Sequence, residues 1–327
     1  MDNTIYLSSY SLIEPEDEFY FYIPSWLNVW ESHIYNKALK ATRAQGWGFK
    51  RFGTRRELYA REMIRKPDYI KYIEALEQAS DIALQQLAAK VRMQLIKSRT
   101  ALFYVDSWGE AGLYENMSSA LHAGIIDTLP KNLLKKFSVN GFTCKMRGEK
   151  QSLMQAMRVA QDYLNWDICD FVVICAAYRS IPLLVFSDED IAGGGKRKSQ
   201  DTNVNLSVER VGCFIFSKRE SALRIDCGGY IDAGNDIHRA APLITAEAPI
   251  DRLFFTGLRK SRAGSALLKA TEAAGLAALN LTEKYGGSGC LTPALSWVAL
   301  EQQPPATART IVPDNYGGYN YFDTWRD

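Results

Sequence analysis

The sequence predicts an α/β fold in which largely parallel sheets are covered by helices. The first observation is a set of continuous apolar runs of strand length, such as DFVVICAAY at 170–178, which is typical of strands buried on both faces. The second is the amphipathic runs of helical period that lie between them. The same alternation restarts after Pro249, so we expect two related halves, residues 1–205 and 206–327.

The composition is that of a folded globular protein, with 47% apolar and 23% charged residues in a chain of 327. A formal net charge of +2 gives no reason to expect a nucleic-acid partner or an anionic membrane. No apolar stretch is long enough to span a bilayer, and the N-terminus lacks the pattern of a signal peptide, so we expect a cytoplasmic location. The six cysteines lie mostly in apolar runs and show no spacing of a zinc site.

The elements of the first half follow one another in the strand and helix rhythm of a parallel sheet. In order, the periodicity predicts one or two helices over 69–98, a strand at 100–106, a helix at 113–126, a strand at 137–144, a helix at 150–164 and a strand at 170–178. The glycine- and lysine-containing segment 187–203 is predicted to be a surface loop, with a phosphate or carrier-protein contact as the alternative.

The second half is predicted to begin with a hairpin of two strands over 211–234. A strand at 250–257, a helix at 265–279, and a glycine turn at 284–289 that opens a further helix then follow. Two strands, at 309–318 and 320–325, end the chain.

Four segments carry a resemblance to a known family. They are KYGGSGCLTPAL (284–295), IDRLFFTGLRK (250–260), NYGGYNYFDTW (315–325), and FSVNGFTC (137–144) with the helix and strand that follow it. In order and spacing they resemble the thiolase superfamily of condensing enzymes, most closely ketoacyl-ACP synthase III. The resemblance covers about residues 95–327. It implies a layered α-β-α-β-α sandwich of two halves, no permanently bound cofactor, and an acyl-CoA or acyl-carrier-protein thioester as substrate.

The family uses a cysteine thiolate at the N-terminus of a buried helix, with a histidine and an asparagine that stabilise the developing charge. Matched residue by residue, the resemblance places Thr256 at the position of the histidine and Gly287 at that of the asparagine. A threonine hydroxyl does not titrate near neutral pH, and glycine has no side chain. The resemblance therefore predicts an incomplete catalytic set.

The position of the nucleophile depends on which segment is aligned. Aligning the helix puts Lys150, or Gln151 beside it, at the family's cysteine. Aligning the strand puts Cys144 close to that position and makes CKMRGE an insertion. Lys145 and Arg147 flank Cys144 and favour a thiolate there, while a structural cysteine in a remodelled turn is the alternative.

No histidine fills the vacant position. His33 lies in the poorly matched N-terminal region, His122 is expected near a helix end, and His238 is expected in a loop. A mechanism built on imidazole is therefore not expected.

The leading hypothesis is a non-catalytic subunit of a heteromeric condensing enzyme in fatty-acid, polyketide or secondary-metabolite biosynthesis. Its expected partners are a catalytically active ketosynthase or thiolase-like homologue and an acyl carrier protein. An alternative is an acyltransferase or thioesterase that acts through Cys144. A third hypothesis is a binding protein that meets an acidic carrier through two basic clusters: Lys196, Arg197 and Lys198, and Arg259, Lys260 and Arg262.

Overall fold

The computed structural model describes residues 3–24, 27–52, 66–107, 131–147, 150–192, 203–232, 243–244, 250–257, 269, 271–314 and 317–326. The predicted helix at 113–126 with His122, His238, and the two basic clusters lie outside these residues. Within them, no helix is both long and apolar enough to cross a membrane.

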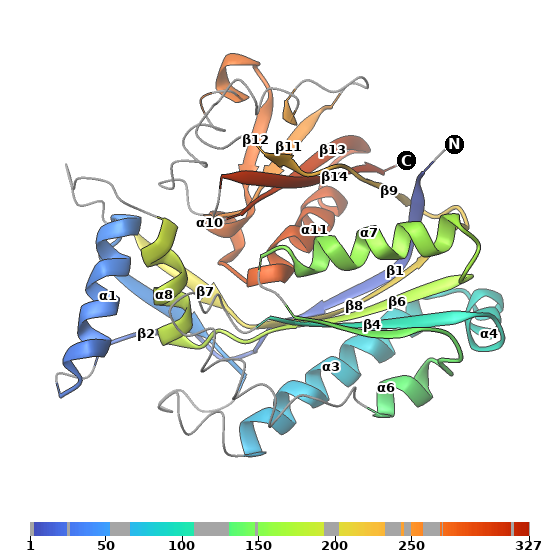
Figure 1. Ribbon diagram of the computed structural model, residues 1–327, viewed down its shortest axis with the longest axis horizontal. Coiled ribbons are helices and arrows are strands. Elements are labelled where there is room, and N and C mark those ends of the chain that lie inside the picture. The colour runs from blue at the N-terminus through green and yellow to red at the C-terminus, as the bar shows by residue number, and fades with distance from the viewer. Residues whose placement is uncertain are drawn as a thin grey trace.

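An eleven-stranded sheet forms the centre of the molecule (Figure 1). Its strand order is β12-β11-β13-β14-β9-β1-β8-β6-β4-β5, and β10 pairs with β14. The strands are β1 (Ile5–Ile13), β4 (Thr100–Ser107), β5 (Thr143–Arg147), β6 (Phe171–Tyr178), β8 (Arg210–Ser217), β9 (Leu223–Cys227), β10 (Ile231–Asp232), β11 (Arg252–Phe255), β12 (Ala277–Asn280), β13 (Ala306–Pro313) and β14 (Gly318–Arg326).

The strand order contains the same unit twice. Starting from the junction of β1 and β9, one unit reads β1-β8-β6-β4-β5 and the other β9-β14-β13-β11-β12. If the five strands of each unit are numbered along the chain, both units have the same order across the sheet. From the junction outward it is first, fifth, fourth, second and third. These are the two related halves that the sequence predicts. The boundary at residue 205 stays a prediction; β8, at 210–217, pairs with β1 and β6 of the first unit.

The parallel pairing predicted from the strand and helix rhythm is confirmed. β4 is parallel to β5 and β6, and β11 is parallel to β12 and β13. β8 and β14 run antiparallel to their neighbours. The carboxyl ends of the parallel strands in each unit thus meet at one edge, which is where α/β sheets carry their sites.

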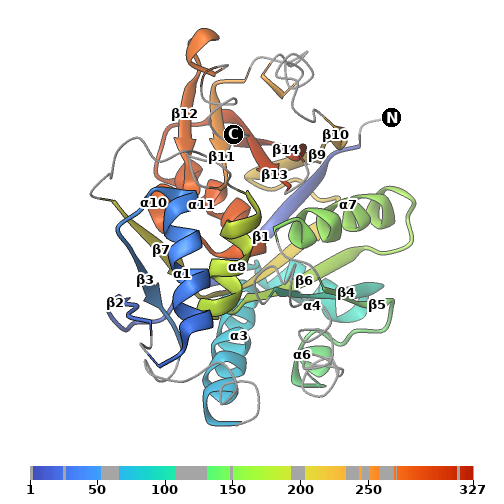
Figure 2. The same ribbon diagram turned by 60° about the vertical axis from the view of Figure 1, so that its left-hand side comes forward.

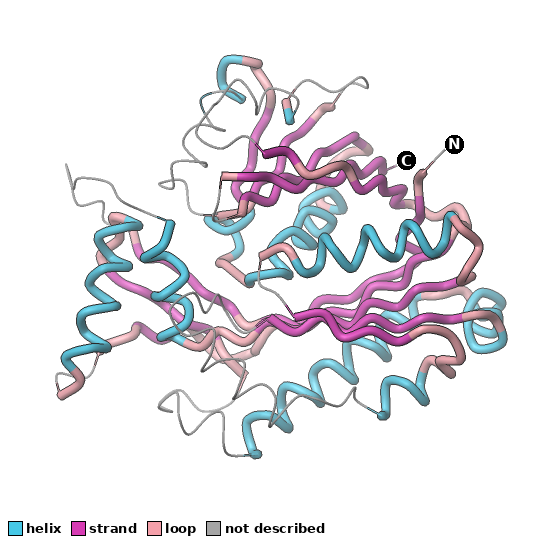
Figure 3. The backbone as a smooth tube through the Cα atoms, in the orientation of Figure 1, coloured by secondary structure: helices cyan, strands magenta, loops and turns pink. Residues whose placement is uncertain are grey.

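Helices divide the molecule into layers (Figures 1 and 3). α3 (Lys66–Gln86), α4 (Ala89–Lys97) and α6 (Lys131–Lys136) cover the outer face of the first unit. α7 (Ser152–Asn165) and α11 (Leu295–Glu301) lie between the two units, where Trp297 contacts rings from both, among them Phe214 and Phe322. α10 (Leu281–Tyr285) and the 3-10 helix η3 (Gly289–Ala294) lead into α11.

A second, three-stranded sheet lies beside the large one (Figure 2). Its order is β2 (Tyr20–Phe21), β3 (Gly46–Lys50) and β7 (Val204–Val208). Helices α1 (Val29–Thr42) and α8 (Pro182–Ala192) cover one face, where Phe186 packs on Trp47 and Phe49.

One predicted element of the second half is wrong, and a second, the helix predicted over 265–279, is helical at residues 269 and 271–273 but ends earlier than predicted. β8 and β9 do not form a hairpin, because β1 lies between them and pairs with both. The helix predicted over 265–279 overlaps β12, which begins at Ala277. Gly275, at φ +66, donates its N–H to Glu272 O at 3.2 Å, and this left-handed glycine reverses the chain before the strand.

The strand predicted at 137–144 lies elsewhere: β5 spans Thr143–Arg147. Ser138 has φ +48, and Asn140 accepts the N–H of Thr100 on its side-chain oxygen at 3.1 Å. Residues 137–141 therefore form an irregular turn that lies against the start of β4 and leads into β5. By contrast, α3 with α4, β4, α7 and β6 match their predicted ranges within a few residues.

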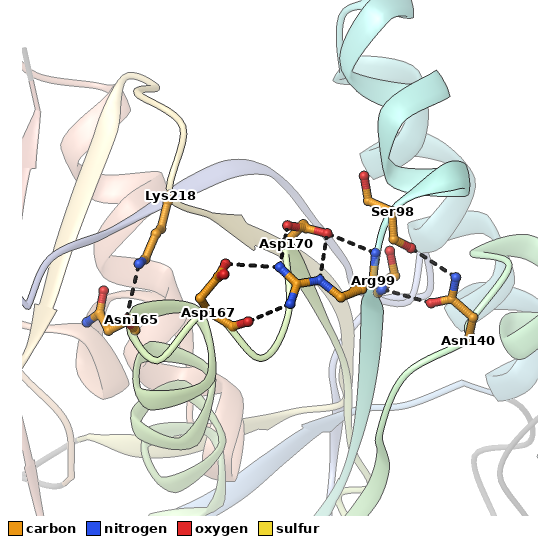
Figure 4. Close-up of polar contacts among 8 residues, drawn as sticks. Ser98, Arg99, Asn140, Asn165, Asp167, Asp170 and Lys218 are labelled. Atoms are coloured by element: carbon orange, nitrogen blue, oxygen red, sulfur yellow. Dashed lines mark hydrogen bonds and ion pairs between the residues drawn. The ribbon is translucent and has the colours of Figure 1, made fainter.

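The amino-terminal ends of β4 and β6 are tied together by Arg99 (Figure 4). Its guanidinium donates to both carboxylate oxygens of Asp170, at 3.0 and 3.3 Å, and to Asp167 Oδ1 at 2.9 Å. The hydrogen bonds from Arg99 lower the pKa of Asp170. This cluster lies at the amino-terminal ends of β4 and β6, away from the edge where their carboxyl ends lie.

Candidate functional site

The start of α7 is the place where the resemblance, aligned on the helix, puts the family's nucleophile. Here α7 begins at Ser152, which is fully buried, and Gln151 precedes it. Gln151 Nε2 donates to Val312 O at 3.0 Å, and Gln151 Oε1 accepts from Asn320 Nδ2 at 2.6 Å. The first turn of the helix is therefore fastened to β13 and β14 of the second unit, and Lys150, half-buried, lies just before it.

Cys144 does not lie after a strand, as the strand alignment expects. It is the second residue of β5, opposite Phe103 of β4 in the ladder. Its side chain is half-buried and packs against the apolar cluster around α7. The residues from Lys145 to Gln151 separate it from α7, so its catalytic role stays a prediction.

Thr256 follows β11 directly, as the resemblance predicts for the residue at the histidine position. It is buried, and its N–H donates to Ile311 O at 3.1 Å. The next residue, Gly257, has φ +95; its N–H donates to Thr282 Oγ1 at 2.8 Å, and its carbonyl accepts from Asn280 at 2.9 Å. The N–H and the carbonyl of Gly257 are thus both hydrogen-bonded, to side chains of residues 280 and 282.

Gly287 is bound through its backbone to β7. Its N–H donates to Leu206 O and its carbonyl accepts from Val208 N, each at 2.8 Å. An added Cβ would meet its nearest atom, in Thr282, at 3.5 Å, which is an ordinary contact. A side chain would therefore fit at position 287. Lack of space does not explain why a glycine stands where the resemblance places the family's asparagine.

Arg210, the first residue of β8, holds the glycine turn in place. Its guanidinium donates to the carbonyls of Tyr285 at 2.7 Å and Gly286 at 3.3 Å, and to the hydroxyl of Ser288. Glu14 accepts two further bonds from it, at 2.8 and 3.1 Å. Burial lowers the pKa of Arg210, against the opposing effect of Glu14.

The neighbouring residue, Glu209, organises a second buried hub. Its side chain is fully buried and accepts from Arg51 Nε at 3.2 Å, from the N–H of Phe52 at 2.7 Å and from the N–H of Ser180 at 3.1 Å. The adjacent charges Glu209 and Arg210 thus connect the small sheet to the glycine turn. Sequence reasoning missed both, although two adjacent charges ahead of the apolar run VGCFIF are a signal for them.

The first turn of η3 packs against β6 and α7. Gly289 has φ +50, and an added Cβ would lie 2.4 Å from the ring of Tyr178. The next residue, Cys290, is fully buried and hydrogen-bonds with Ser107 and Ser152. Burial raises the pKa of the Cys290 thiol to about 12, so this thiol stays protonated near neutral pH.

Together these contacts bring the three predicted positions to one place. β13 links two of them, because Ile311 O binds Thr256 and Val312 O binds Gln151. η3 links the glycine turn to Ser152. Of the described residues, only His33 is a histidine, and it lies exposed on α1. The described polar groups around these positions largely bond to one another.

The comparisons with known proteins agree with this fold. No protein-family model and no curated protein matches the sequence. Among solved structures, a variant of OleA from Xanthomonas campestris matches with TM-score 0.58 and 10% identity, covering 98% of each chain.

Two polyketide ketosynthases are also similar. The ketosynthase AntDE, solved with the type II acyl-carrier protein AntF, matches with TM-score 0.59 and 12% identity over 100% of each chain. Ketosynthase twelve of the bacillaene synthase of Bacillus amyloliquefaciens gives 0.61 and 10%, over 100% of this chain and 75% of that one. At such identities the likeness concerns the fold, and the predicted thiolase-like fold is confirmed.

Proposed function

We propose that this chain is a non-catalytic, ketosynthase-like subunit that pairs with a catalytically active homologue in a condensing complex. The pathway class is fatty-acid, polyketide or secondary-metabolite biosynthesis. The observation that carries the proposal is the start of α7, where Gln151 is bonded to Val312 and Asn320 instead of a thiolate facing a substrate.

The chemistry of condensation supports this proposal. The reaction needs a nucleophile to carry the acyl group and donors that stabilise an enolate and an oxyanion. The family positions hold Thr256 and Gly287, and Cys290 is a protonated, buried thiol. Loss of several members of one catalytic constellation costs about three to six orders of magnitude in rate.

A pairing surface for the homologue is available at the end of the large sheet. β5 is the last strand in its order, and among the described strands its outer edge has no partner. Phe142, directly before β5, is exposed, and so are Trp166 and Ile168 in the connection from α7 to β6, Trp166 by 68%. An edge strand with apolar neighbours is suited to pairing with another chain. In this proposal the partner supplies the thiolate and binds the acyl-CoA or acyl-carrier thioester, and this chain holds no resident cofactor.

A second candidate function is acyl transfer or thioester hydrolysis through Cys144. The observation that favours it is exposure: Cys144 is half-buried, while the other five cysteines are buried. This reaction would need neither the missing histidine nor the missing asparagine, because no decarboxylation takes place.

Intact-protein mass spectrometry separates the two. The purified chain, alone and co-expressed with a candidate homologue, is incubated with acyl-CoA and acyl-carrier thioesters. We expect an acyl adduct on the homologue only, and better solubility of this chain in the pair. An adduct on this chain that disappears in Cys144→Ala, and persists in the matched variant Cys169→Ala, would replace the proposal with the acyl-transfer function. A stable, monodisperse monomer that binds none of the candidate homologues would contradict the subunit role.

A further inference from the structure

The segment 19–30, which leads from β2 into α1, exposes an unusual amount of apolar surface. Phe21 is 66% exposed, Ile23 85% and Val29 80%, and Phe19, Leu27 and Trp30 are exposed as well. Single exposed apolar side chains are ordinary, whereas a run of six within one short segment marks a surface that meets a partner. This surface lies on the small sheet, at the edge opposite β7, the strand that bonds to the glycine turn.

The exposed residues of β2 share one face. Tyr20 and Tyr22 point toward α1 and α8 and pack on the cluster around Phe49 and Phe186. Phe19, Phe21 and Ile23 alternate with them and therefore point to the opposite face. On that face Gly48 of β3 has no side chain, and Phe19 and Leu206 lie over it, as the contacts of an added Cβ show. The outer face is thus apolar and nearly flat.

β2 also offers hydrogen-bonding groups at its free edge. It is the terminal strand of the sheet β2-β3-β7, and none of the described residues pairs with its outer side. Tyr22 donates its N–H inward, to Trp47 O at 2.9 Å. In an antiparallel ladder alternate residues point their N–H and C=O groups in opposite directions. The backbone groups of Phe21 and Ile23 therefore face outward.

Charge decides which partner fits. Residues 1–36 contain no lysine or arginine, and their acidic residues are Asp2, Glu14, Glu16, Asp17, Glu18 and Glu31. Glu16, Asp17 and Glu18 are exposed directly before β2. An acidic rim repels an acidic carrier protein or an anionic membrane and attracts a basic segment. Pairing with β2 of a second copy would bring two acidic segments together.

We propose that the outer edge and outer face of β2 form a docking surface for an extended, apolar segment of a partner protein that is flanked by lysine or arginine and adds to the small sheet as a fourth strand. Backbone hydrogen bonds to Phe21 and Ile23 supply affinity, and the acidic residues before β2 select the basic flanks. The proposal is independent of the catalytic state of the chain.

The test uses a fluorescent peptide with three Val-Thr repeats between two lysines at each end, and a twin with glutamates in place of the lysines. Fluorescence anisotropy of the full-length protein should show the lysine peptide binding at least about tenfold more tightly. Phe21→Pro removes the outward N–H but leaves the inward bonds of β2, and should weaken binding about tenfold with an unchanged circular dichroism spectrum.

Two further variants keep the result interpretable. Glu16→Lys combined with Glu18→Lys, both at exposed positions, should reverse the preference between the peptides. Trp166→Ser, which removes exposed apolar surface at the end of α7, is the matched control and should bind as the parent does. No binding, equal binding of both peptides by the parent protein, or undiminished binding of the lysine peptide by both Phe21→Pro and the Glu16→Lys, Glu18→Lys double variant would overturn the proposal.

Other occupants of β2 would also show themselves. Self-association that Phe21→Pro abolishes, seen by sedimentation, would make a second copy the occupant. Binding to phosphatidylcholine vesicles that Phe21→Ser abolishes and Trp166→Ser leaves intact would make it a lipid surface. Either result would overturn the proposal.

Discussion

Arg210 shows how one side chain fixes the conformation of a turn that lies far from it in sequence. It supplies donors to two consecutive carbonyls, of Tyr285 and Gly286, which a left-handed glycine leaves pointing at it. Without the guanidinium these buried acceptors would lose their partner, and the cost of such a loss exceeds the net value of the bonds themselves.

We therefore expect Arg210→Met to lower the free energy of unfolding by about 3 kcal/mol, measured by urea denaturation. Lys50→Met is the matched control, because Lys50 is the other cation bound to Glu14, at 2.9 Å, and that carboxylate is half-exposed. Its cost should stay within about 1 kcal/mol. Equal effects of the two substitutions would show that Arg210 acts on Glu14 alone.

The Arg99 cluster gives the protein an acid-sensitive contact. Because Arg99 lowers the pKa of Asp170 in the folded state, the carboxylate stabilises the fold above its unfolded pKa of about 3.9. That stabilisation is lost as the pH falls through the folded value.

Asp170→Asn should therefore flatten the decline in melting temperature below pH 4, while the variant melts below the parent at pH 7. Asp251→Asn removes a carboxylate that accepts the N–H of Thr307 at 2.8 Å, and it provides a comparison in which a backbone N–H takes the place of the arginine. A decline of unchanged steepness in Asp170→Asn would rule out this carboxylate as the source.

At the scale of elements, the glycine turn contains two nearby positions, 287 and 289, that differ in whether they can accept a side chain. Gly289 needs its left-handed φ of +50 and lies against the ring of Tyr178, while Gly287 has room for a Cβ. Gly289→Ala should cost about 3 kcal/mol through strain and overpacking. Gly287→Ala should change stability by no more than about 1 kcal/mol. Thermal unfolding monitored by circular dichroism compares them, and a reversed order would mean that the turn is held differently.

Sequence patterns correctly predicted elements that are buried along their whole length or on one face. β4 and β6 are buried along their whole length, and α7 has one apolar face, so their periods are clear. β1 was missed although it occupies the centre of the sheet, because IYLSSYSLI places serines where a buried strand usually has apolar residues. Ser9 and Ser11 are tolerated there because they donate to carbonyls of α3 at 2.8 and 2.7 Å.

The positions of the candidate site were proposed from local motifs and stay predictions, and the connections between them were not predicted. Thr256 and Gly287 follow from motif positions along the chain. The bonds of Gln151 to Asn320 and of Arg210 to the glycine turn join residues more than seventy positions apart. No local pattern carries such pairings, because they depend on how the two units face each other.

At the scale of the whole molecule, the two units share one core. Trp297 is fully buried between them and contacts Phe214 and Phe216 of the first unit and Phe322 of the second. Neither unit can expose this face without losing the contacts of the other, so the halves should not unfold separately despite their similar topology.

Trp297→Ala should therefore destabilise the protein by about 4 kcal/mol and lower the stability of both units together. Far-ultraviolet circular dichroism and tryptophan fluorescence should report one coincident transition in the parent protein. Trp166→Ala, at an exposed position, should leave the midpoint nearly unchanged. Two separated transitions in the parent would show that the units are independent.

The position of β1 between β8 and β9 has a consequence for synthesis on the ribosome. β1 spans Ile5–Ile13, whereas its two partners span Arg210–Ser217 and Leu223–Cys227. At about 5–20 residues per second, the first strand waits on the order of ten seconds or more before a partner is translated. Nascent chains that stop before residue 210 cannot pair β1 at all, so prematurely terminated products should be retained by chaperones or degraded rather than accumulate as a folded first half.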